Sequence, residues 1–160
     1  MVPVIRKVYI AGPMSGIPAF NYPAFHSLEK SLRLIVLAPK VHMDVINPAA
    51  FGESSPEALA AIMASPDGDP SVLYPYTRLT WGDYLARSVK LIGDDPDLDA
   101  IVTLPGWDTS RGSRIETFIG HVRGLKIVDY HFTYDNRITL HEHPRSALIR
   151  AWEGDIYAEF

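Results

Sequence analysis

The strongest constraint on the fold is a strand–helix–strand pattern near the amino terminus. Residues 7–12, KVYIAG, are mostly apolar and end in glycine, as short buried strands do. Residues 23–34 then carry Phe25, Leu28 and Leu32 at helical spacing, behind a proline that suits a first helical turn. Residues 35–48 are again apolar and end in Asn-Pro, which is typical of a strand followed by a turn. Two strands joined by a helix predict a βαβ unit of a parallel sheet.

The remainder of the chain continues this alternation of helices and strands. Before the next strand we predict a short helix over 56–64, a loop tip over 65–71, and a helix over 80–93 with Thr80 as N-cap. After it come a strand over 99–104, a helix over 114–124 closed by Gly124, and a strand over 125–130. One more strand and a short helix are expected within 131–160. The pattern predicts a single α/β domain over residues 1–160, with helices on both faces of a mostly parallel sheet.

Composition excludes several classes of function. The chain has no cysteine, which removes disulfides, thiolate zinc sites and a cysteine nucleophile, and fits a cytoplasmic protein. Its net charge of -4 argues against a nucleic-acid polymer as partner. No apolar run approaches the ~20 residues that a membrane span needs, and the first ten residues lack the apolar core of a signal peptide. We therefore expect a cytoplasmic protein that binds a small molecule and no membrane.

Two loops carry most of the candidate chemistry. AGPMSG follows the first strand, and PGWDTSRGS follows the strand at 99–104. Ligands of parallel sheets bind beyond the carboxyl ends of the strands, so these loops should face one crevice. The hydroxyl groups and backbone amides there suit a phosphate or a sugar, and the Arg111 guanidinium suits a phosphate. Asp108 and Glu116 would supply carboxylates for chemistry on the ligand.

Each of these residues also has a purely structural explanation. Gly12 and Gly16 can serve only the turn, and Asp108 can cap one. Glu116 can simply complement the dipole of its helix, and Trp107 can belong to the core. The HEH sequence at 141–143 places two histidines on one face of a strand, but without further ligands we predict no metal site and no cofactor.

The order of the motifs is more specific than any one of them. YIAGPMSG and NYPAF near the start, INPA, TWGDYLARSVKLI, DAIVTLPGWDTSRGSRIE and GLKIV follow one another along the chain. This series resembles the nucleoside 2-deoxyribosyltransferase-like family, above all its small phage and bacterial members and the related 2'-deoxynucleoside 5'-phosphate N-hydrolases. The likeness covers residues 7–130, and residues 131–160 form a carboxyl-terminal extension. It implies a flavodoxin-like or Rossmann-like domain that assembles as a homodimer or larger homo-oligomer.

The resemblance also implies an activity, namely cleavage of the N-glycosidic bond of a nucleoside or its 5'-monophosphate. Glu116 matches the family's nucleophile at C1' of the sugar, and Ser110 matches a serine that contacts the phosphate. The remaining implied contacts to sugar and phosphate fall in the two loops and on an aromatic residue just after the first. With the residues that we add from the loops themselves, the predicted binding residues are Gly12, Ser15, Gly16, Tyr22 (or Phe20), Ser110, Arg111, Gly112 and Ser113.

One departure from the family pattern concerns the second acid. Active relatives carry an aspartate in the helix before this strand, and Ser88 occupies the corresponding position. Asp83 lies five residues earlier and points away from Ser88 on a helix. Asp108 is the acid that we assign to the leaving base or the sugar, with Asp99 as an alternative. Three functions therefore stay open: a hydrolase or deoxyribosyltransferase acting preferably on a monophosphate, a non-catalytic module that binds or senses nucleotides, and a structural or assembly protein in which the loops are only turns.

Overall fold

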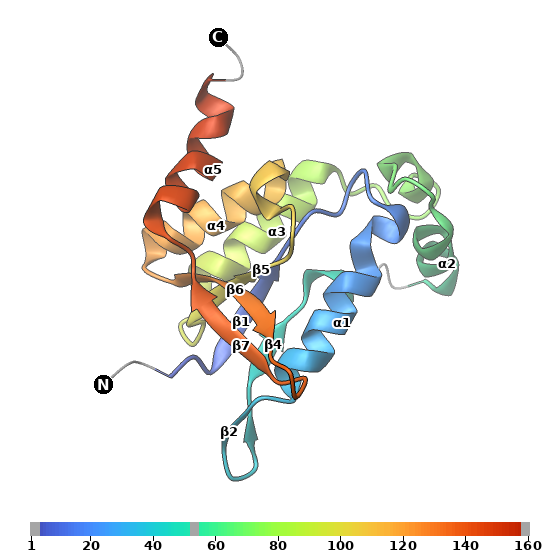
Figure 1. Cartoon of the computed structure of the whole chain (residues 1–160). Helices are drawn as coiled ribbons and strands as arrows, with labels where there is room; N and C mark the ends of the chain where they lie inside the picture. The colour runs from blue at the N-terminus through green and yellow to red at the C-terminus, as the bar shows by residue number, and fades with distance from the viewer. Residues whose placement is uncertain (1–3, 52–54, 158–160) are drawn as a thin grey trace.

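A central sheet of five strands organises the chain (Figure 1). The strands β4, β1, β5 and β6 are parallel and lie in that order, and β7 is antiparallel to β6 at the edge. Their bounds are β1 Lys7–Ala11, β4 Asp44–Ile46, β5 Ala100–Thr103, β6 Lys126–Phe132 and β7 Ile138–Glu142. This order is that of flavodoxin-like folds, so the predicted α/β class with a mostly parallel sheet is confirmed.

The computed structural model describes residues 4–51 and 55–157. Its α-helices are α1 Tyr22–Arg33, α2 Pro56–Ala64, α3 Trp81–Asp94, α4 Arg111–Arg123 and α5 Arg145–Tyr157. Short 3-10 helices are η1 Pro18–Asn21, η2 Pro48–Ala50, η3 Pro70–Leu73 and η4 Trp107–Thr109. In the part of the chain that is described, no helix combines the length and the apolarity that crossing a bilayer would require.

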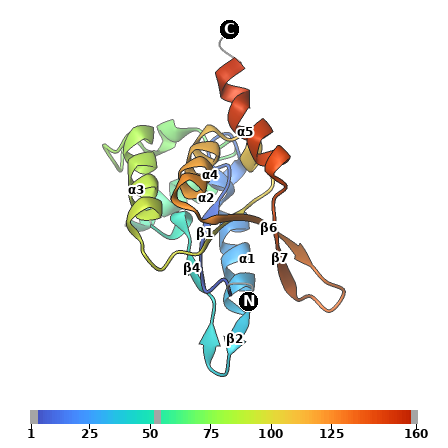
Figure 2. The same cartoon turned by 90° about the vertical axis from the view of Figure 1, so that its left-hand side faces the viewer.

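Alternating residues of β1 bury opposite faces of the sheet. Val8 and Ile10 pack with the apolar side chains of α1 and with Ile62 of α2, in one core cluster. Tyr9 and Ala11 point to the other face, where the core cluster includes Ile92 of α3 and residues of α5. Figure 2 shows α3 and α4 side by side over that second face. Helices cover both faces as predicted, and Tyr9 is directed toward α3 and α4.

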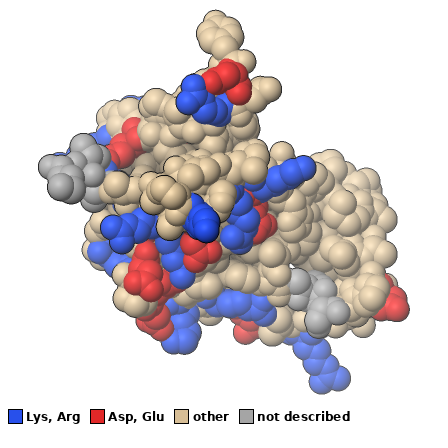
Figure 3. Space-filling view, turned by 90° about the horizontal axis from the view of Figure 1, so that it is seen from below, with Lys and Arg blue, Asp and Glu red and all other residues tan. Residues whose placement is uncertain are grey.

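The connections create a switch point at the centre of the sheet. From β1 the chain crosses through α1 to β4 on one side, and from β5 it crosses through α4 to β6 on the other. The carboxyl ends of β1 and β5 therefore diverge into different helices and leave a crevice between them. Ionic side chains gather at the opposite, amino end, where Lys7 pairs with Asp44 and Asp95. Figure 3, the view from below, shows charges of both signs interspersed on that side.

Residues 35–48 do not form the single strand that their apolar character predicts. Val36–Ala38 (β2) and Val41–His42 (β3) pair as a separate antiparallel hairpin, and only Asp44–Ile46 joins the main sheet. The reversal occurs at Pro39 and Lys40, and Lys40 has a φ of 65°. A two-residue turn of this kind ends a strand even where apolar residues continue on both sides.

Residues 65–71 also differ from the prediction, which made them a loop tip, because they contact another loop. The Ala19 amide donates to the Ser65 carbonyl at 2.8 Å, and the Gly16 amide donates to the Gly68 carbonyl at 3.3 Å. Gly68 is buried and has a φ of 64°. The segment is therefore docked on the loop that follows β1.

The loop after β1 has an unusual backbone where this segment docks. Ala19, Phe20 and Asn21 all have positive φ, at 52°, 52° and 59°. A left-handed conformation costs an L-residue roughly 1–2 kcal/mol, so three in succession need support from their surroundings. The Asn21 side chain supplies part of it by donating to the Pro13 carbonyl at 3.0 Å.

Helix boundaries follow the predicted caps closely. Thr80 is the N-cap of α3 as predicted, and it forms a reciprocal capping box with Asp83. Gly124 ends α4 with a φ of 92°. The prediction for the start of α4 was three residues late, because Ser110 rather than a later residue is the N-cap. Its Oγ accepts the Ser113 amide at 3.4 Å.

Candidate active site

The crevice at the carboxyl ends of β1 and β5 holds a cavity of about 1220 Å³. Both predicted loops contribute to it, so the prediction that they face one another is confirmed. Gly16 is not among the lining residues; its φ of 81° and its bond to Gly68 give it a place in the turn. The predicted site residues that line the cavity are Gly12, Ser15, Tyr22, Ser110, Arg111, Gly112, Ser113 and Glu116, and Phe20 joins them.

Glu116 lies in the second turn of α4 and is the buried acid of this cavity. Its side chain is 9% exposed, and Oε1 lies 2.8 Å from the Tyr9 hydroxyl. The same hydroxyl lies 2.9 Å from Oγ of Ser88 on α3. A tyrosine has one proton to donate and a carboxylate is the strongest acceptor within reach, so we assign that proton to the bond with Glu116. The strand β1 and both helices of one face thus fix the carboxyl group.

Burial dominates the ionisation of Glu116. Loss of water disfavours the charged form and raises the pKa of this carboxyl from 4.5 to about 7, although the hydroxyl groups of Tyr9 and Ser88 act in the opposite direction. Burial and the nearby Glu116 charge also raise the pKa of Tyr9 well above its ordinary value. Near neutral pH the carboxyl group is divided between its acid and its carboxylate form, whereas Tyr9 keeps its proton.

This raised pKa predicts a specific pH dependence of stability. An unfolded Glu116 ionises near 4.5 but the folded one only near 7, so the folded state holds the proton more tightly between these values. Its contribution to the free energy of unfolding is fully present below pH 4.5 and falls as the pH rises through 7, by on the order of 3 kcal/mol. Glu116→Gln cannot ionise and should be more stable than the wild type at pH 8.

Denaturant unfolding of both proteins between pH 4.5 and 8 measures this difference. All other titrating groups are shared by the two proteins, so the pH dependence of the difference in unfolding free energy isolates Glu116. A difference that stays constant from pH 5 to pH 8 would show that the carboxyl group has an ordinary pKa.

The glycines of the two loops serve different purposes. A Cβ on Gly12 would lie 2.7 Å from Cβ of Leu104, so this glycine lets the ends of β1 and β5 approach. A Cβ on Gly112 would meet no atom within 4 Å, and its φ is not positive. Neither packing nor backbone geometry requires a glycine at that position. Gly112 lines the cavity at the first turn of α4, and the amino end of a helix attracts anions.

Three arginines add positive charge to the cavity wall. Arg111 lies over the Trp81 ring at 5.5 Å, and Arg87 lies over the Tyr84 ring at 5.6 Å. Arg78 lines the same wall. None of the three forms an ion pair with an acidic residue of the described chain. Guanidinium groups on a cavity wall favour an anionic ligand, for which phosphate is the best geometric match.

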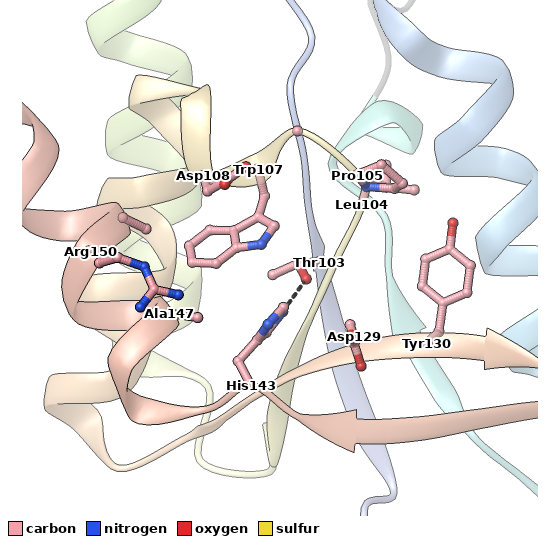
Figure 4. A pocket seen from close by; sticks show the side chains of 12 residues that line it. Thr103, Leu104, Pro105, Trp107, Asp108, Asp129, Tyr130, His143, Ala147 and Arg150 are labelled. Carbon is pink, nitrogen blue, oxygen red and sulfur yellow. Dashed lines mark hydrogen bonds between the residues drawn. The ribbon is translucent and has the colours of Figure 1, made fainter.

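Asp108 lies elsewhere, in a second cavity of about 570 Å³ on the other side of the β5 end (Figure 4). Pro105 and Gly106 line both cavities and separate them. The structure therefore places Asp108 and Glu116 in two different cavities, whereas the sequence predicted one site for both. The left-handed turn at Gly106, with a φ of 82°, sends the chain into η4, whose Asp108 faces away from the central cavity.

Trp107 and His143, the last residue of the HEH sequence, both line the second cavity. His143 lies 2.7 Å from Oγ1 of Thr103 and packs on the buried Trp107 ring at 5.2 Å. Burial lowers the pKa of His143. His141 lies 3.0 Å from Oγ1 of Thr139 instead, on the exposed edge strand. Among residues 4–51 and 55–157, no three acidic, histidine or cysteine side chains are arranged to hold a metal ion.

Asp99 cannot serve as the second acid either. Its Oδ2 accepts the backbone amides of Arg6 and Lys7 at 2.7 and 3.0 Å. These contacts hold it at the amino end of β5, at the opposite edge of the sheet from the cavity.

Sequence reasoning missed Tyr9, which makes the closest contact to Glu116. The available signal was a tyrosine inside an otherwise aliphatic strand, because a buried hydroxyl needs a partner. It also missed three other residues that line the cavity. Arg78 comes from a segment without a clear periodic pattern, Trp81 is the first residue of α3, and Arg87 lies in the middle of that helix.

Comparison with known proteins identifies one family model. The domain of unknown function DUF4406 matches residues 6–129. Curated proteins and solved structures yield no match. The matched span includes every residue that lines the central cavity, whereas β7 and α5 lie beyond it.

Proposed function

The chain belongs to the DUF4406 family, and we propose that it cleaves the N-glycosidic bond of a nucleotide with Glu116 as the nucleophile. The observation that carries this proposal is the position of the Glu116 carboxyl group, buried in a cavity whose other walls suit a phosphate and a sugar. A carboxylate below a sugar ring stabilises the positive charge that develops at C1' and can trap it as an ester.

The reaction divides into two steps at C1'. In the first, a Glu116 oxygen forms a bond to C1' while the C1'–N bond breaks, and the electron pair leaves with the base, which takes up a proton from water. In the second, water attacks C1', its excess proton passes to solvent and the Glu116 carboxylate is released, which makes the protein a hydrolase; a second base in place of water would make it a transferase. The Tyr9 hydroxyl supports both steps by holding Oε1 in place.

A nucleoside 5'-monophosphate is the preferred form of the substrate. The three guanidinium groups and the amino end of α4 both favour a phosphate over a neutral 5'-hydroxyl group. We also propose that the protein acts in the cytoplasm, where such nucleotides are found, and as a homo-oligomer. The exposed side chains of Phe118 and Val122 on α4 are available for contact with a second copy.

The direct test is incubation with a panel of nucleosides and 5'-monophosphates, followed by chromatography for free base. Release of base from at least one nucleotide supports the proposal. If none is released although nucleotides raise the melting temperature, the second candidate function applies, a module that binds nucleotides without cleaving them. The observation that favours this candidate is Ser88, which supplies a hydroxyl group beside Glu116 where the family resemblance implies an acid.

Arg111→Ala tests the phosphate preference. Loss of a charge-assisted contact should raise KM for monophosphates about tenfold or more and leave KM for free nucleosides within about twofold, because only the monophosphate carries the anion. Arg150→Ala is the matched control, since Arg150 is an exposed arginine of the second cavity. Equal weakening of both substrate classes by Arg111→Ala would show that this arginine does not contact phosphate.

A further inference from the structure

We infer that the second cavity is a binding site in its own right, for a small zwitterion with one ammonium and one carboxylate group, as in an amino acid or a short peptide. This inference goes beyond the proposed function, because it concerns another cavity and involves no nucleotide. The volume of about 570 Å³ is within the roughly 300–1,000 Å³ that small-molecule sites occupy. The cavity lies where β5 ends, and ligands of parallel sheets bind beyond the carboxyl ends of the strands.

Charged groups that line this cavity are left without partners in the described part of the chain. The side chains of Asp108 and Arg150, which have opposite signs, form neither an ion pair nor a hydrogen bond there. Asp129 has one buried oxygen, Oδ1, without a hydrogen bond, and its Oδ2 lies 3.4 Å from Nε2 of His131. The Asp129 side chain is still 38% exposed, so its carboxylate is open to a ligand. The cavity therefore offers a guanidinium group and carboxylate oxygens that can still form hydrogen bonds.

The two signs of charge are separated within the cavity. Figure 4 shows the Arg150 guanidinium on the α5 side and Asp129 on the β6 side, with His143 between them. His143 is held in this place by Oγ1 of Thr103 at 2.7 Å and by the Trp107 ring. A ligand that spans the cavity therefore meets a cation at one end and an anion at the other.

The balance of these charges disfavours a phosphate group. Burial lowers the pKa of His143, so its ring is uncharged near neutral pH. The carboxylates of Asp108 and Asp129 then outnumber the one guanidinium group, that of Arg150, in the lining of the cavity. A phosphate group carries about two negative charges and would be repelled by the excess carboxylate. A zwitterion has no net charge, and its ammonium group is attracted.

An amino acid or a short peptide would meet each of these groups with a matching one. Its ammonium group has three N–H donors for the carboxylates of Asp129 and Asp108. Its carboxylate group accepts two parallel hydrogen bonds from the planar guanidinium of Arg150. An apolar side chain packs against Pro105 and Ala147, which also line the cavity.

The carboxyl-terminal part of the chain completes this site. His143, Ala147, Arg150 and Ala151 line the cavity and lie beyond residue 129, where the match to the family model ends. His143 follows the end of β7, and the other three belong to α5. These two elements therefore supply the cation for the carboxylate of the ligand and one wall of the cavity.

Three compounds with the same phenyl ring separate the contributions of the two charges. L-Phenylalanine carries both charges, 2-phenylethylamine only the ammonium and 3-phenylpropanoate only the carboxylate. In isothermal titration calorimetry with the full chain at pH 7, we expect the Kd of phenylalanine to be at least about tenfold lower than that of either other compound. The reason is that each of the two lacks one charge-assisted contact. A thermal-shift scan of the other standard amino acids and of alanyl-phenylalanine shows whether an amino acid or a peptide is preferred.

Variants of the two charged ends assign the contacts. Arg150→Ala should weaken phenylalanine and 3-phenylpropanoate at least about tenfold and leave 2-phenylethylamine within about twofold. Asp129→Asn keeps the size of the side chain and should instead weaken phenylalanine and 2-phenylethylamine. Arg145→Ala is the matched control, because Arg145 is an exposed arginine of the same helix that does not line the cavity.

Three results would overturn the inference. The first is that neither the amino acids nor the dipeptide bind. The second is equal affinity for the three phenyl compounds, which would mean that the cavity recognises the ring and not the charges. The third is weakening of phenylalanine by Arg111→Ala but not by Arg150→Ala, which would place the ligand in the central cavity. None of these results bears on the proposed function, whose own test is the release of free base from nucleotides.

Discussion

Glu116→Gln is expected to reduce base release by at least about 10³-fold, the largest effect of any substitution in this protein. The amide keeps the size and the buried position of the side chain but cannot form the ester bond to C1', so the entire covalent route is removed. The fold should be retained, because Tyr9 can still donate to the side-chain oxygen at this position. Chromatographic detection of free base, with the most reactive nucleotide of the panel, measures the loss.

Tyr9→Phe is the matched control for this result. It removes the hydroxyl group that orients Glu116 and opposes the rise of its pKa, but leaves the nucleophile in place. We expect partial activity whose pH profile is displaced to higher pH, in contrast to the uniform loss in Glu116→Gln. A folded Glu116→Gln protein with wild-type turnover would refute the catalytic role of this residue.

Gly68→Ala should cause the largest loss of stability outside the core, about 2 kcal/mol or more. A Cβ at this position would lie 2.4 Å from the Ile17 carbonyl oxygen and 2.9 Å from its nitrogen, and both are backbone atoms that cannot move independently. The residue also has a φ of 64°, which adds the cost of a left-handed alanine. The docked segment 65–71 should therefore detach from the loop after β1, and KM for the nucleotide should rise because η3 lines the cavity.

Gly16→Ala separates the two causes of this effect. Gly16 has a similar positive φ of 81°, but a Cβ there would meet no atom within 4 Å. It should cost only the backbone strain, roughly 1 kcal/mol. Equal midpoints of denaturant unfolding for the two variants would show that the contact with Ile17 contributes nothing.

Local signals in the sequence predicted most of the fold. The glycine that ends β1, the Thr80 cap with Asp83 and the left-handed Gly124 each act through neighbouring residues, and each appears in the structure as expected. The hairpin at Pro39 and Lys40 was not predicted, because apolar residues on both sides of the turn look like one strand. The contacts within the site, in contrast, could not be predicted without the topology of the sheet. Ser88 and Glu116 lie 79 and 107 positions after Tyr9 in the sequence. The three side chains meet only because β1 faces α3 and α4.

The position of Asp108 shows where spacing ceases to be informative. It lies eight residues before Glu116, in the same loop-to-helix segment, and spacing alone places both in one crevice. The direction of the Gly106 turn decides otherwise, since it directs the two side chains to opposite sides of one wall. A turn of this kind depends on backbone torsion angles that residue types restrict but do not determine.

The left-handed run at residues 19–21 has an evolutionary consequence. Its geometry is held partly by the hydrogen bond from the Ala19 amide to Ser65, in a segment about fifty residues further along the chain, so neither stretch can change independently of the other. A substitution in one that weakens the attachment would be tolerated only with a compensating change in the other. Across related sequences, these two distant stretches should therefore vary as a pair, more tightly than either varies with its immediate neighbours.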